Sequence, residues 1–501
     1  MDKMRPGIVL LSLVVLFMVA GIITPKQMVA GFSNRGMITV ALLFLVSEGI
    51  RQSGALGAVV KKLLPEKGTS VTKAQLRVLP VISAFSAFLN NTPVVVIFAP
   101  ILKNWAKKVG LPCTKFLIPL SYATILGGLC TLIGTSTNLV IHGMMIDRGI
   151  GGLKMFDLAY IGIPITIAGL AFIILASKKL LPVNRDDSFE EEEADAAEET
   201  GQHIVEVVLA SRFPGLKRKL KNFDFKRRYG AEVKEIRQGG QVITKNIGEV
   251  RLQEGDTLVL LADDAFTRTW GDSSVFLMMT NGQEIPSNPV PAWKKWTALS
   301  LLIVMIVGAT IGELPYMKEH FPKVQMDMFF FASVTAVVMA WLKLFPPKKY
   351  TKYISWDILI TIACAFAISK AMTNSGMADW IADFIIGLCH SHGPYVLLAV
   401  LYIITNVITE LITNNAAAAL AFPLALSIAN QLGVDPMPFF ILVCVASSAC
   451  FSSPIGYQTN LIVQGIGNYR FTDFVRVGLP LNLLVALVSI LLIPQIWPFE
   501  M

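Results

Sequence analysis

Long apolar stretches separated by short polar segments constrain this chain more than any other feature. A membrane-spanning helix needs about 20 apolar residues. Stretches that reach or approach this length lie at about 8–24, 37–54, 116–145, 158–181, 297–311, 328–345, 354–372, 439–466 and 476–496. Two further apolar stretches, 77–105 and 394–428, are interrupted in the middle by Asn-rich segments. The sequence therefore predicts an all-α polytopic membrane protein.

Charged residues are scarce and unevenly distributed. Only 16% of the 501 residues are charged and the mean hydropathy is +0.60, whereas soluble domains are about 25% charged. Residues 182–296 hold 16 of the 43 Lys and Arg residues and 20 of the 35 Asp and Glu residues. The apolar remainder is strongly basic, which is typical of the cytoplasmic loops of a membrane protein. No nucleic-acid partner is expected from the pI of 9.0.

Four short motifs recur in the same order in the two apolar parts of the chain. SGALG from Ser53 matches SGMAD from Ser375, NNT from Asn90 matches NNA from Asn414, TSTNLVIHG matches GYQTNLIVQG, and FDLAYIGIPI matches TDFVRVGLPL. The offsets are 322, 324, 322 and 316 residues. Such a repetition predicts a duplicated unit. The first transmembrane repeat is 1–181, and the second is 297–501 with one extra leading helix.

The Lys and Arg residues predict opposite orientations for the two repeats. The first interrupted stretch is flanked by Lys and Arg on both sides, whereas the second has none between Lys370 and Arg470. Starting from a cytoplasmic N-terminus, this places the ends of the first hairpin in the cytoplasm, those of the second outside, and the C-terminus outside. Inverted repeats, each with a re-entrant hairpin and a broken helix, are typical of secondary transporters.

The polar interruptions carry the candidate binding residues. Polar backbone at membrane depth survives only where it faces protein or a water-filled cavity. Asn, Thr and Ser offer oxygens to a hard cation and N–H or O–H donors to an anion. The candidates for the substrate are Asn91, Thr92, Asn414 and Asn415, and those for sodium are Asn90, Asn91, Gly134, Thr135, Ser136, Asn138, Thr413, Asn415, Ser452, Ser453, Gly456 and Asn460. The alternative for the breaks within helices is an ordinary kink bonded by Ser and Thr.

Two sets of charged residues lie inside apolar stretches. Glu410, four residues before Asn414, is a candidate coupling carboxylate for a cation or a proton, and the alternative is a solvated position near the mouth of the hairpin. Glu48 and Arg51, three residues apart, are expected to pair with each other. The six Cys residues show no metal spacing, and no nucleophile–base pair accompanies the hairpin tips, so we expect no resident cofactor, no metal beyond sodium and no enzyme activity.

The charged island predicts a small cytoplasmic α/β domain at 201–275, between an acidic linker at 182–200 and a second linker at 276–296. HIVEVVLA and DTLVLLA are expected to be strands, and RQGGQVIT a hairpin turn. A basic cluster at 217–228 is expected to be a solvated face, and the alternative is a site for a nucleotide or an anionic lipid. No phosphate-binding Gly motif accompanies the cluster.

The order of the NNTP tip, the GTSTN break, the second TNN tip and the QTN break resembles the divalent anion:sodium symporter family. The island resembles a TrkA-C domain, the ligand-binding part of modules that regulate potassium conductance. The resemblance implies an elevator-type homodimer that carries sodium with a divalent anion, and Ser-Asn-Thr motifs at the tips. These motifs become Asn90-Asn91-Thr92 here and, with NNA matched to NNT, Asn414-Asn415-Ala416. The loss of hydroxyls in the second motif favours sulfate over a dicarboxylate.

The leading hypothesis is therefore a sodium-coupled symporter of a divalent oxyanion, sulfate first and dicarboxylate second, in a bacterial inner membrane. Its expected partners are the anion, sodium, membrane lipid, a second copy of the chain and a small ligand of the cytoplasmic domain. The alternatives are a cation/proton antiporter that uses Glu410 and an ion channel gated by the TrkA-C-like domain. The absence of a TVGYG-type filter disfavours the channel.

Overall fold

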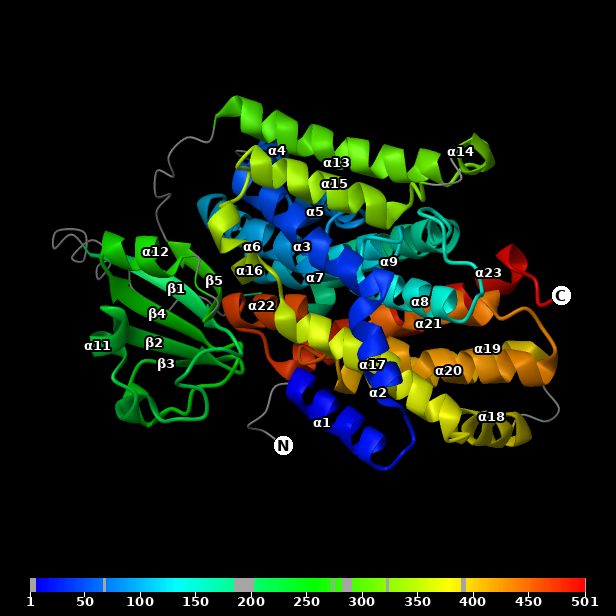
Figure 1. Ribbon diagram of the computed structural model, residues 1–501. Helices are drawn as coiled ribbons and strands as arrows, with labels where there is room; N and C mark the ends of the chain where they lie inside the picture. The colour runs from blue at the N-terminus through cyan, green and yellow to red at the C-terminus, as the bar shows by residue number, and fades with distance from the viewer. Residues whose placement is uncertain are drawn as a thin grey trace.

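The computed structural model describes residues 6–65, 69–183, 202–271, 273, 275–281, 291–320, 324–388 and 393–500. A large bundle of helices forms the body of the molecule, and a small domain built on a β-sheet lies against one end of it (Figure 1). Almost all of the acidic linker predicted at 182–200 lies outside the described residues.

The first half of the helical body runs from α1 to α9. Its helices are α1 (Pro6–Val19), α2 (Pro25–Ala30), α3 (Arg35–Ser53), α4 (Ala55–Leu63), α5 (Val71–Ser86), α6 (Asn91–Lys108), α7 (Leu117–Gly128), α8 (Ser136–Asp147) and α9 (Ala159–Leu180). Gly54 separates α3 from α4 with a left-handed backbone (φ 67°). This conformation costs Gly little and other residues more, so the chain turns at that position.

The second half runs from α13 to α23. Its helices are α13 (Ala292–Gly312), α14 (Pro315–His320), α15 (Met328–Trp341), α16 (Tyr350–Tyr353), α17 (Trp356–Asn374), α18 (Met377–Leu388), α19 (Gly393–Leu411), α20 (Asn414–Leu432), α21 (Met437–Ser448), α22 (Gln458–Ile466) and α23 (Phe471–Ile496). Gly376, with φ 69°, separates α17 from α18 as Gly54 separates α3 from α4.

Both predicted types of interruption are present. Helices α5 and α6 form a hairpin around 87–90, and α19 and α20 form another around 412–413. The segments 129–135 and 449–457 separate α7 from α8 and α21 from α22. Helices α7, α8 and α21 have 12 residues each, about 18 Å at 1.5 Å per residue. Each is shorter than a hydrocarbon core of about 30 Å, so the breaks fall within the bundle.

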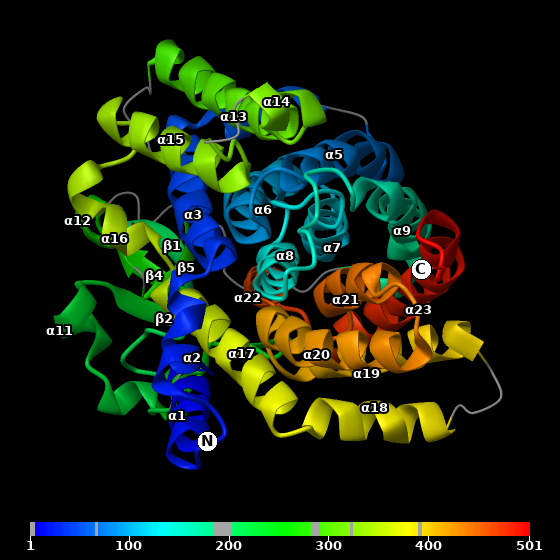
Figure 2. The ribbon, with the colours of Figure 1, turned by 45° about the vertical axis from the view of Figure 1, so that its right-hand side comes forward.

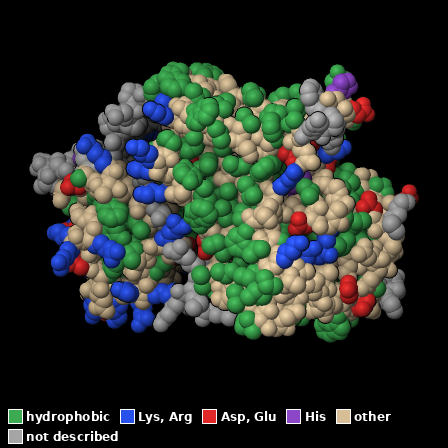
Figure 3. Space-filling model, in the orientation of Figure 1, with side chains coloured by type: hydrophobic (Ala, Val, Ile, Leu, Met, Phe, Trp, Pro, Cys, Tyr) green, Lys and Arg blue, Asp and Glu red, His purple; other side chains and the backbone are tan. Residues whose placement is uncertain are grey.

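Seven helical segments of the described chain are long and apolar enough to cross a membrane: Pro25–Ser53, Ala159–Leu180, Ala292–Gly312, Trp356–Asn374, Gly393–Leu411, Asn414–Leu432 and Phe471–Ile496. Leu479, Leu483, Leu487 and Leu491, spaced four apart on α23, are each at least 50% exposed, as a lipid-facing stripe would be. Apolar side chains cover much of the helical body, whereas Lys and Arg gather over the small domain (Figure 3). The chain is an integral membrane protein.

The two halves interlock. Helix α8 of the first half packs against α20 and α21 of the second, and α22 of the second packs against α6 and α7 of the first. Figure 2 shows α7, α8, α21 and α22 in the middle, with α9 and α23 side by side at one edge. The ends of the broken helices therefore meet the opposite half.

The small domain contains a five-stranded antiparallel sheet of order β3-β2-β4-β1-β5. The strands are β1 (His203–Leu209), β2 (Glu232–Gln238), β3 (Gln241–Ile243), β4 (Thr257–Ala262) and β5 (Phe276–Asn281), with helices α11 (Phe225–Tyr229) and α12 (Asp264–Trp270). Gly239 and Gly240 form the predicted hairpin turn, both with positive φ. The linker prediction at 276–296 was wrong at its start, because β5 pairs with β1 inside the sheet.

Candidate functional site

A cavity of about 920 Å³ connects the two hairpin tips with the small domain. Asn90 and Thr92 of the first tip line it, as do Thr413, Asn414 and Asn415 of the second. Both tips lie at helix N-termini, because α6 begins at Asn91 and α20 at Asn414. Free backbone N–H groups at such ends, together with the helix dipole, favour a negative ligand.

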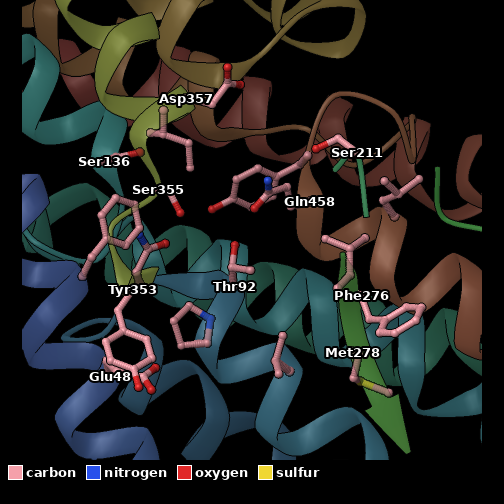
Figure 4. A pocket seen from close by; sticks show the side chains of 18 of the residues that line it. Glu48, Thr92, Ser136, Ser211, Phe276, Met278, Tyr353, Ser355, Asp357 and Gln458 are labelled. Atoms are coloured by element: carbon pink, nitrogen blue, oxygen red, sulfur yellow. The ribbon is translucent and has the colours of Figure 1, made fainter. Parts of the chain in front are cut away.

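Figure 4 shows how the two ends of this cavity differ. Thr92, Ser136 and Gln458 lie around the end formed by the helical body, whereas Phe276 and Met278 line the end formed by the small domain. The small domain therefore borders the space into which the tips open.

The pair Glu48 and Arg51 also lines the cavity. Arg51 binds Glu48 in a bidentate manner, with Nε–Oε2 2.8 Å and Nη2–Oε1 2.7 Å. The predicted pairing is therefore confirmed, and the carboxylate neutralises the guanidinium next to the tips.

In the first tip, Asn91 is fully bonded to protein. Its amide oxygen accepts from the Tyr457 hydroxyl at 2.8 Å, and its amide nitrogen lies 2.6 Å from Ser86 Oγ and 3.0 Å from the Thr124 carbonyl oxygen. Asn91 is only 2% exposed. The middle residue of this tip is therefore turned away from the cavity and held by both halves of the protein.

The second tip has a hydrogen bond equivalent to the one between Ser86 and Asn91. This bond shows which residues of the two tips correspond to each other. Thr409 Oγ1 lies 2.9 Å from Asn414 Oδ1, and Ser86 is likewise five residues before Asn91. Asn91 therefore matches Asn414, at an offset of 323. Matching NNA at Asn414 to NNT at Asn90 was wrong by one residue, because α20 begins at Asn414 rather than after it.

In the corrected register, Thr413-Asn414-Asn415 stands against Asn90-Asn91-Thr92. The second tip thus keeps a hydroxyl, at Thr413, and Ala416 is not part of the motif. Thr413 Oγ1 and one end of the Asn414 amide are buried and have no hydrogen-bond partner among the described residues. An amide can present either its NH₂ or its oxygen after a 180° turn, so this tip can meet an anion or a cation.

The two breaks are closed by asparagines in the same way. Asn138 Nδ2 donates to the carbonyl oxygens of Thr131 (2.9 Å) and Gly128 (3.4 Å), which are 7 and 10 residues earlier. Asn460 Nδ2 donates to Ser453 (3.0 Å) and Cys450 (2.8 Å), again 7 and 10 residues earlier. These predicted site residues therefore hold the unwound backbone in place.

The oxygens of the two asparagines differ. Asn460 Oδ1 accepts from Ser121 of the first half at 2.7 Å, whereas Asn138 Oδ1 has no hydrogen-bond partner within the described parts of the chain. A buried oxygen without a donor is a suitable ligand for a small cation. The amide oxygen at the first break is thus free to bind a cation, whereas the matching oxygen at the second break is bonded to Ser121.

Each break also touches the opposite tip. Ser136 Oγ donates to Asn415 Oδ1 at 3.0 Å, and Tyr457 reaches Asn91 as described. Of the other sodium candidates, Thr135 contacts Thr137 at 3.0 Å and Gly456 borders the cavity. Of the predicted site residues, those that line the cavity are Asn90, Thr92, Ser136, Thr413, Asn414, Asn415 and Gly456, whereas the others are not part of its lining.

Glu410 binds the second break. Its Oε1 accepts from the backbone N–H groups of Phe451 (3.0 Å) and Ser452 (2.8 Å) and from Asn482 Nδ2 (2.7 Å). Ser452, a sodium candidate, also bonds Asn482 through its hydroxyl at 2.9 Å. The partly buried carboxylate therefore organises the backbone beside the second tip.

Sequence reasoning missed Tyr457, Ser86, Thr409 and Asn482. The signal for Ser86 and Thr409 was present, because each is a hydroxyl residue five positions before a tip asparagine. Asn482 lies in the middle of the apolar helix α23, where a polar residue usually has a partner. No pattern in the sequence indicated that Tyr457 reaches the opposite half.

The small domain is docked beside this site by a partly buried ion-pair network. Lys103 Nζ of α6 lies 2.8 Å from Glu206 Oε2 of β1, and Arg237 Nη1 lies 3.2 Å from Glu206 Oε1. Burial raises the pKa of Glu206, but the attraction of Lys103 and then of Arg237 outweighs it and lowers the pKa to about 2. Gly465 of α22 also lies against Gly255, where an added Cβ would be 2.5 Å from the Gly255 carbonyl oxygen.

A family model described as the citrate transporter matches residues 1–419 and 321–498 of the chain. The chain belongs to this citrate transporter family. An uncharacterized transporter of Synechocystis is 29% identical over 96% of this chain and 92% of its own length. A probable sodium/sulfate cotransporter of Chlamydomonas reinhardtii is 23% identical over 93% of this chain and 83% of its own length.

The fold of this family member is also similar to a solved transporter structure. The YdaH transporter of Alcanivorax borkumensis superposes with a TM-score of 0.55 at 13% sequence identity, over 95% of this chain and 89% of that one. A family of transporters indicates that the protein moves a solute and is not an enzyme.

Proposed function

We propose that this protein is a sodium-coupled symporter of a divalent oxyanion, sulfate first and dicarboxylate second. The observation that carries the proposal is the convergence of two helix N-termini, at Asn91 and Asn414, beside one cavity. Each of these tips lies beside a stretch of unwound backbone. N-terminal helix ends attract an anion, and unwound carbonyls with amide oxygens bind sodium.

Coupling to sodium follows from the charge of the site. The tip residues are all uncharged, and Arg51 in the cavity wall is neutralised by Glu48. A divalent anion bound there needs compensating cations, because an unpaired charge in a low-dielectric site is costly. Sodium ions beside the two breaks would supply that charge.

Each half would hold one sodium ion. The first site consists of Asn90, Asn91, Gly134, Thr135, Ser136 and Asn138, and the second of Thr413, Asn415, Ser452, Ser453, Gly456 and Asn460. The substrate would contact Thr92, Asn414 and Asn415, and Asn91 to the extent that Tyr457 releases it. Carbonyl, amide and hydroxyl oxygens are ligands suited to hard cations.

The transport mechanism that we propose is an elevator movement of two inverted repeats within a homodimer. The equal spacing of the bonds of Asn138 and Asn460 supports a duplicated unit. The N-terminus and the small domain would be cytoplasmic and the C-terminus outside, in a bacterial inner membrane. The small domain would act as a TrkA-C-like ligand-binding unit whose ligand changes the rate of transport.

The test is uptake of radiolabelled sulfate and succinate by purified protein in liposomes, with and without an inward sodium gradient. Sodium-dependent anion uptake that is lost in Asn414→Ala supports the proposal. The control is Leu483→Ala, at a lipid-facing position of α23, which should keep this uptake. A protein that exchanges cations for protons with no anion uptake would contradict it.

That outcome would favour the second candidate function, a cation/proton antiporter. Its supporting observation is Glu410, an ionisable side chain beside the second tip. Its carboxylate accepts hydrogen bonds from Cys450, Phe451, Ser452 and Asn482. Glu410→Gln separates the two functions: an antiporter would lose all exchange, whereas a symporter would keep part of its anion-dependent sodium uptake.

A further inference from the structure

Tyr457 distinguishes the two tips. It follows the second break, and its hydroxyl donates to the amide oxygen of Asn91 at 2.8 Å. At the matched position of the first half, 322 residues earlier, stands Thr135, whose hydroxyl lies 3.0 Å from Thr137 of its own half. At this pair of matched positions, only the second half therefore has a phenol, and it reaches the tip of the first half.

This bridge changes what each tip offers to a ligand. In the first tip, Asn90 and Thr92 line the cavity, but the buried Asn91 between them does not. In the second tip, Thr413, Asn414 and Asn415 all line it. In the second tip the Thr413 hydroxyl and the Asn414 amide nitrogen have no partner among the described residues, whereas the first tip has its middle amide occupied by protein.

We propose that Tyr457 is a specificity-determining residue that limits the site to a compact oxyanion with a single binding pole. This inference rests on the proposed anion symport. A linear dicarboxylate needs one set of donors for each carboxylate, at a separation set by its carbon chain. With Asn91 bonded to Tyr457, Ser86 and the Thr124 carbonyl, only the second tip can hold a carboxylate fully. A tetrahedral dianion such as sulfate places its whole charge at one pole.

The size of the side chain acts in the same direction. Tyr457 lines the cavity next to Gln458, so its ring takes up volume at the cavity wall that a longer dianion could otherwise use. Replacing it with Thr, the residue at the matched position, removes the ring and frees the Asn91 amide. Replacing it with Phe keeps the ring and removes only the hydroxyl with its hydrogen bonds to Asn91 and Thr135.

The experiment measures sodium-driven uptake of radiolabelled sulfate into liposomes, with unlabelled selenate or succinate as competitors. In the wild-type protein we expect selenate to compete and succinate to compete weakly. In Tyr457→Thr we expect the succinate concentration for half-inhibition to fall by about tenfold, the scale of discrimination by one side chain in a binding pocket. In Tyr457→Phe the succinate concentration for half-inhibition should lie between those of the wild type and Tyr457→Thr.

Tyr402→Phe is the matched control, because it removes a buried tyrosine hydroxyl that has no partner among the described residues. Its competition profile should equal that of the wild type. Equal inhibition by succinate in the wild type and Tyr457→Thr, with sulfate uptake preserved, would overturn the inference and leave the symporter intact. Strong succinate competition in the wild type would overturn it as well, even if Tyr457→Thr did not fold. If the wild type bound and transported neither anion, the proposed function and the inference would both fail.

Discussion

The two tip-and-break assemblies share a backbone plan but differ in chemistry. Both have a hydroxyl residue five positions before the tip asparagine, and both close the break with an asparagine that reaches back 7 and 10 residues. The first assembly is saturated at its tip and has a free oxygen at its break, on Asn138. The second is open at its tip, and at its break the matching oxygen, on Asn460, accepts a hydrogen bond from Ser121.

The attachment of each break to its hairpin differs too. In the first half, the Thr131 hydroxyl bonds the Ala87 carbonyl, a neutral contact. In the second, Glu410 accepts from two backbone N–H groups, which is a charged contact. Hydrogen bonds to a charged group are worth about 1.5–3 kcal/mol, against about 1 kcal/mol for neutral ones. The second break is therefore expected to be attached to its hairpin more strongly than the first break.

The largest difference should appear when the closing asparagines are removed. Asn460→Ala deletes bonds to Cys450, Ser453 and Ser121, and we expect it to lower the free energy of unfolding by about 3 kcal/mol. Asn138→Ala deletes two bonds, so about 2 kcal/mol is expected. Thermal unfolding in detergent checks the order, and a greater loss in Asn138→Ala would contradict the assigned contacts.

Glu410→Gln should come next. The neutral amide keeps one oxygen for Phe451 and Ser452 but turns an NH₂ group toward donors, so we expect a loss of about 2 kcal/mol. Thr131→Val, which removes the neutral contact of the first half, should cost about 1 kcal/mol. Equal losses in the two variants would show that the charge of Glu410 adds no stability to the second break.

The helices, the breaks and most of the sheet could be predicted because they follow from local patterns. Apolar length predicted the spanning helices, Asn-rich interruptions predicted the tips, and Gly239-Gly240 predicted the hairpin turn. The register between the tips could not be predicted. NNT at Asn90 can be aligned with NNA at Asn414 or, one residue earlier, with TNN at Thr413, and only the Thr409–Asn414 contact distinguishes these alignments. Contacts between the halves, such as Tyr457 with Asn91, depend on packing that no local pattern encodes.

The docking of the small domain on both halves gives a smaller effect. Lys103→Met on α6 leaves Glu206 with Arg237 alone, and we expect the docked state to lose about 1.5 kcal/mol, the low end for a charged hydrogen bond. Hydrogen exchange of β1 should increase, while Lys107→Met, at an exposed position of the same helix, should change nothing.

The pH dependence of this contact has a definite sign. The pKa of Glu206 is about 2 in the folded protein, below about 4.3 in the unfolded chain. Its stabilisation is therefore present above pH 4.3 and is lost as the pH falls toward 2. Lys103→Met should raise the folded-state pKa of Glu206, so the loss should be smaller and complete at a higher pH. An unchanged midpoint would mean that Lys103 does not hold the carboxylate.

The smallest effect on stability should come from the ionisation of Asp256. It should be confined to the contact between the small domain and the second half. Asp256 lies beside Gly255, which packs against Leu461 of α22. Its carboxylate accepts from Gln253 N (2.6 Å) and Gln238 Nε2 (2.8 Å). Burial raises its pKa to about 7, above about 3.9 in the unfolded chain.

Because the folded state prefers protonated Asp256, the stability that it contributes is complete below pH 3.9 and is lost as the pH rises through 7. Raising the pH from 6 to 7 should therefore cost the wild-type domain about 1 kcal/mol and increase hydrogen exchange in α22. Asp256→Asn should remove this dependence. Exchange in α6, held through Lys103 and Glu206, should not respond to this change of pH in either protein. An equal response of α6 and α22 would mean that the domain undocks as one body from both halves, and that the two contacts are not independent.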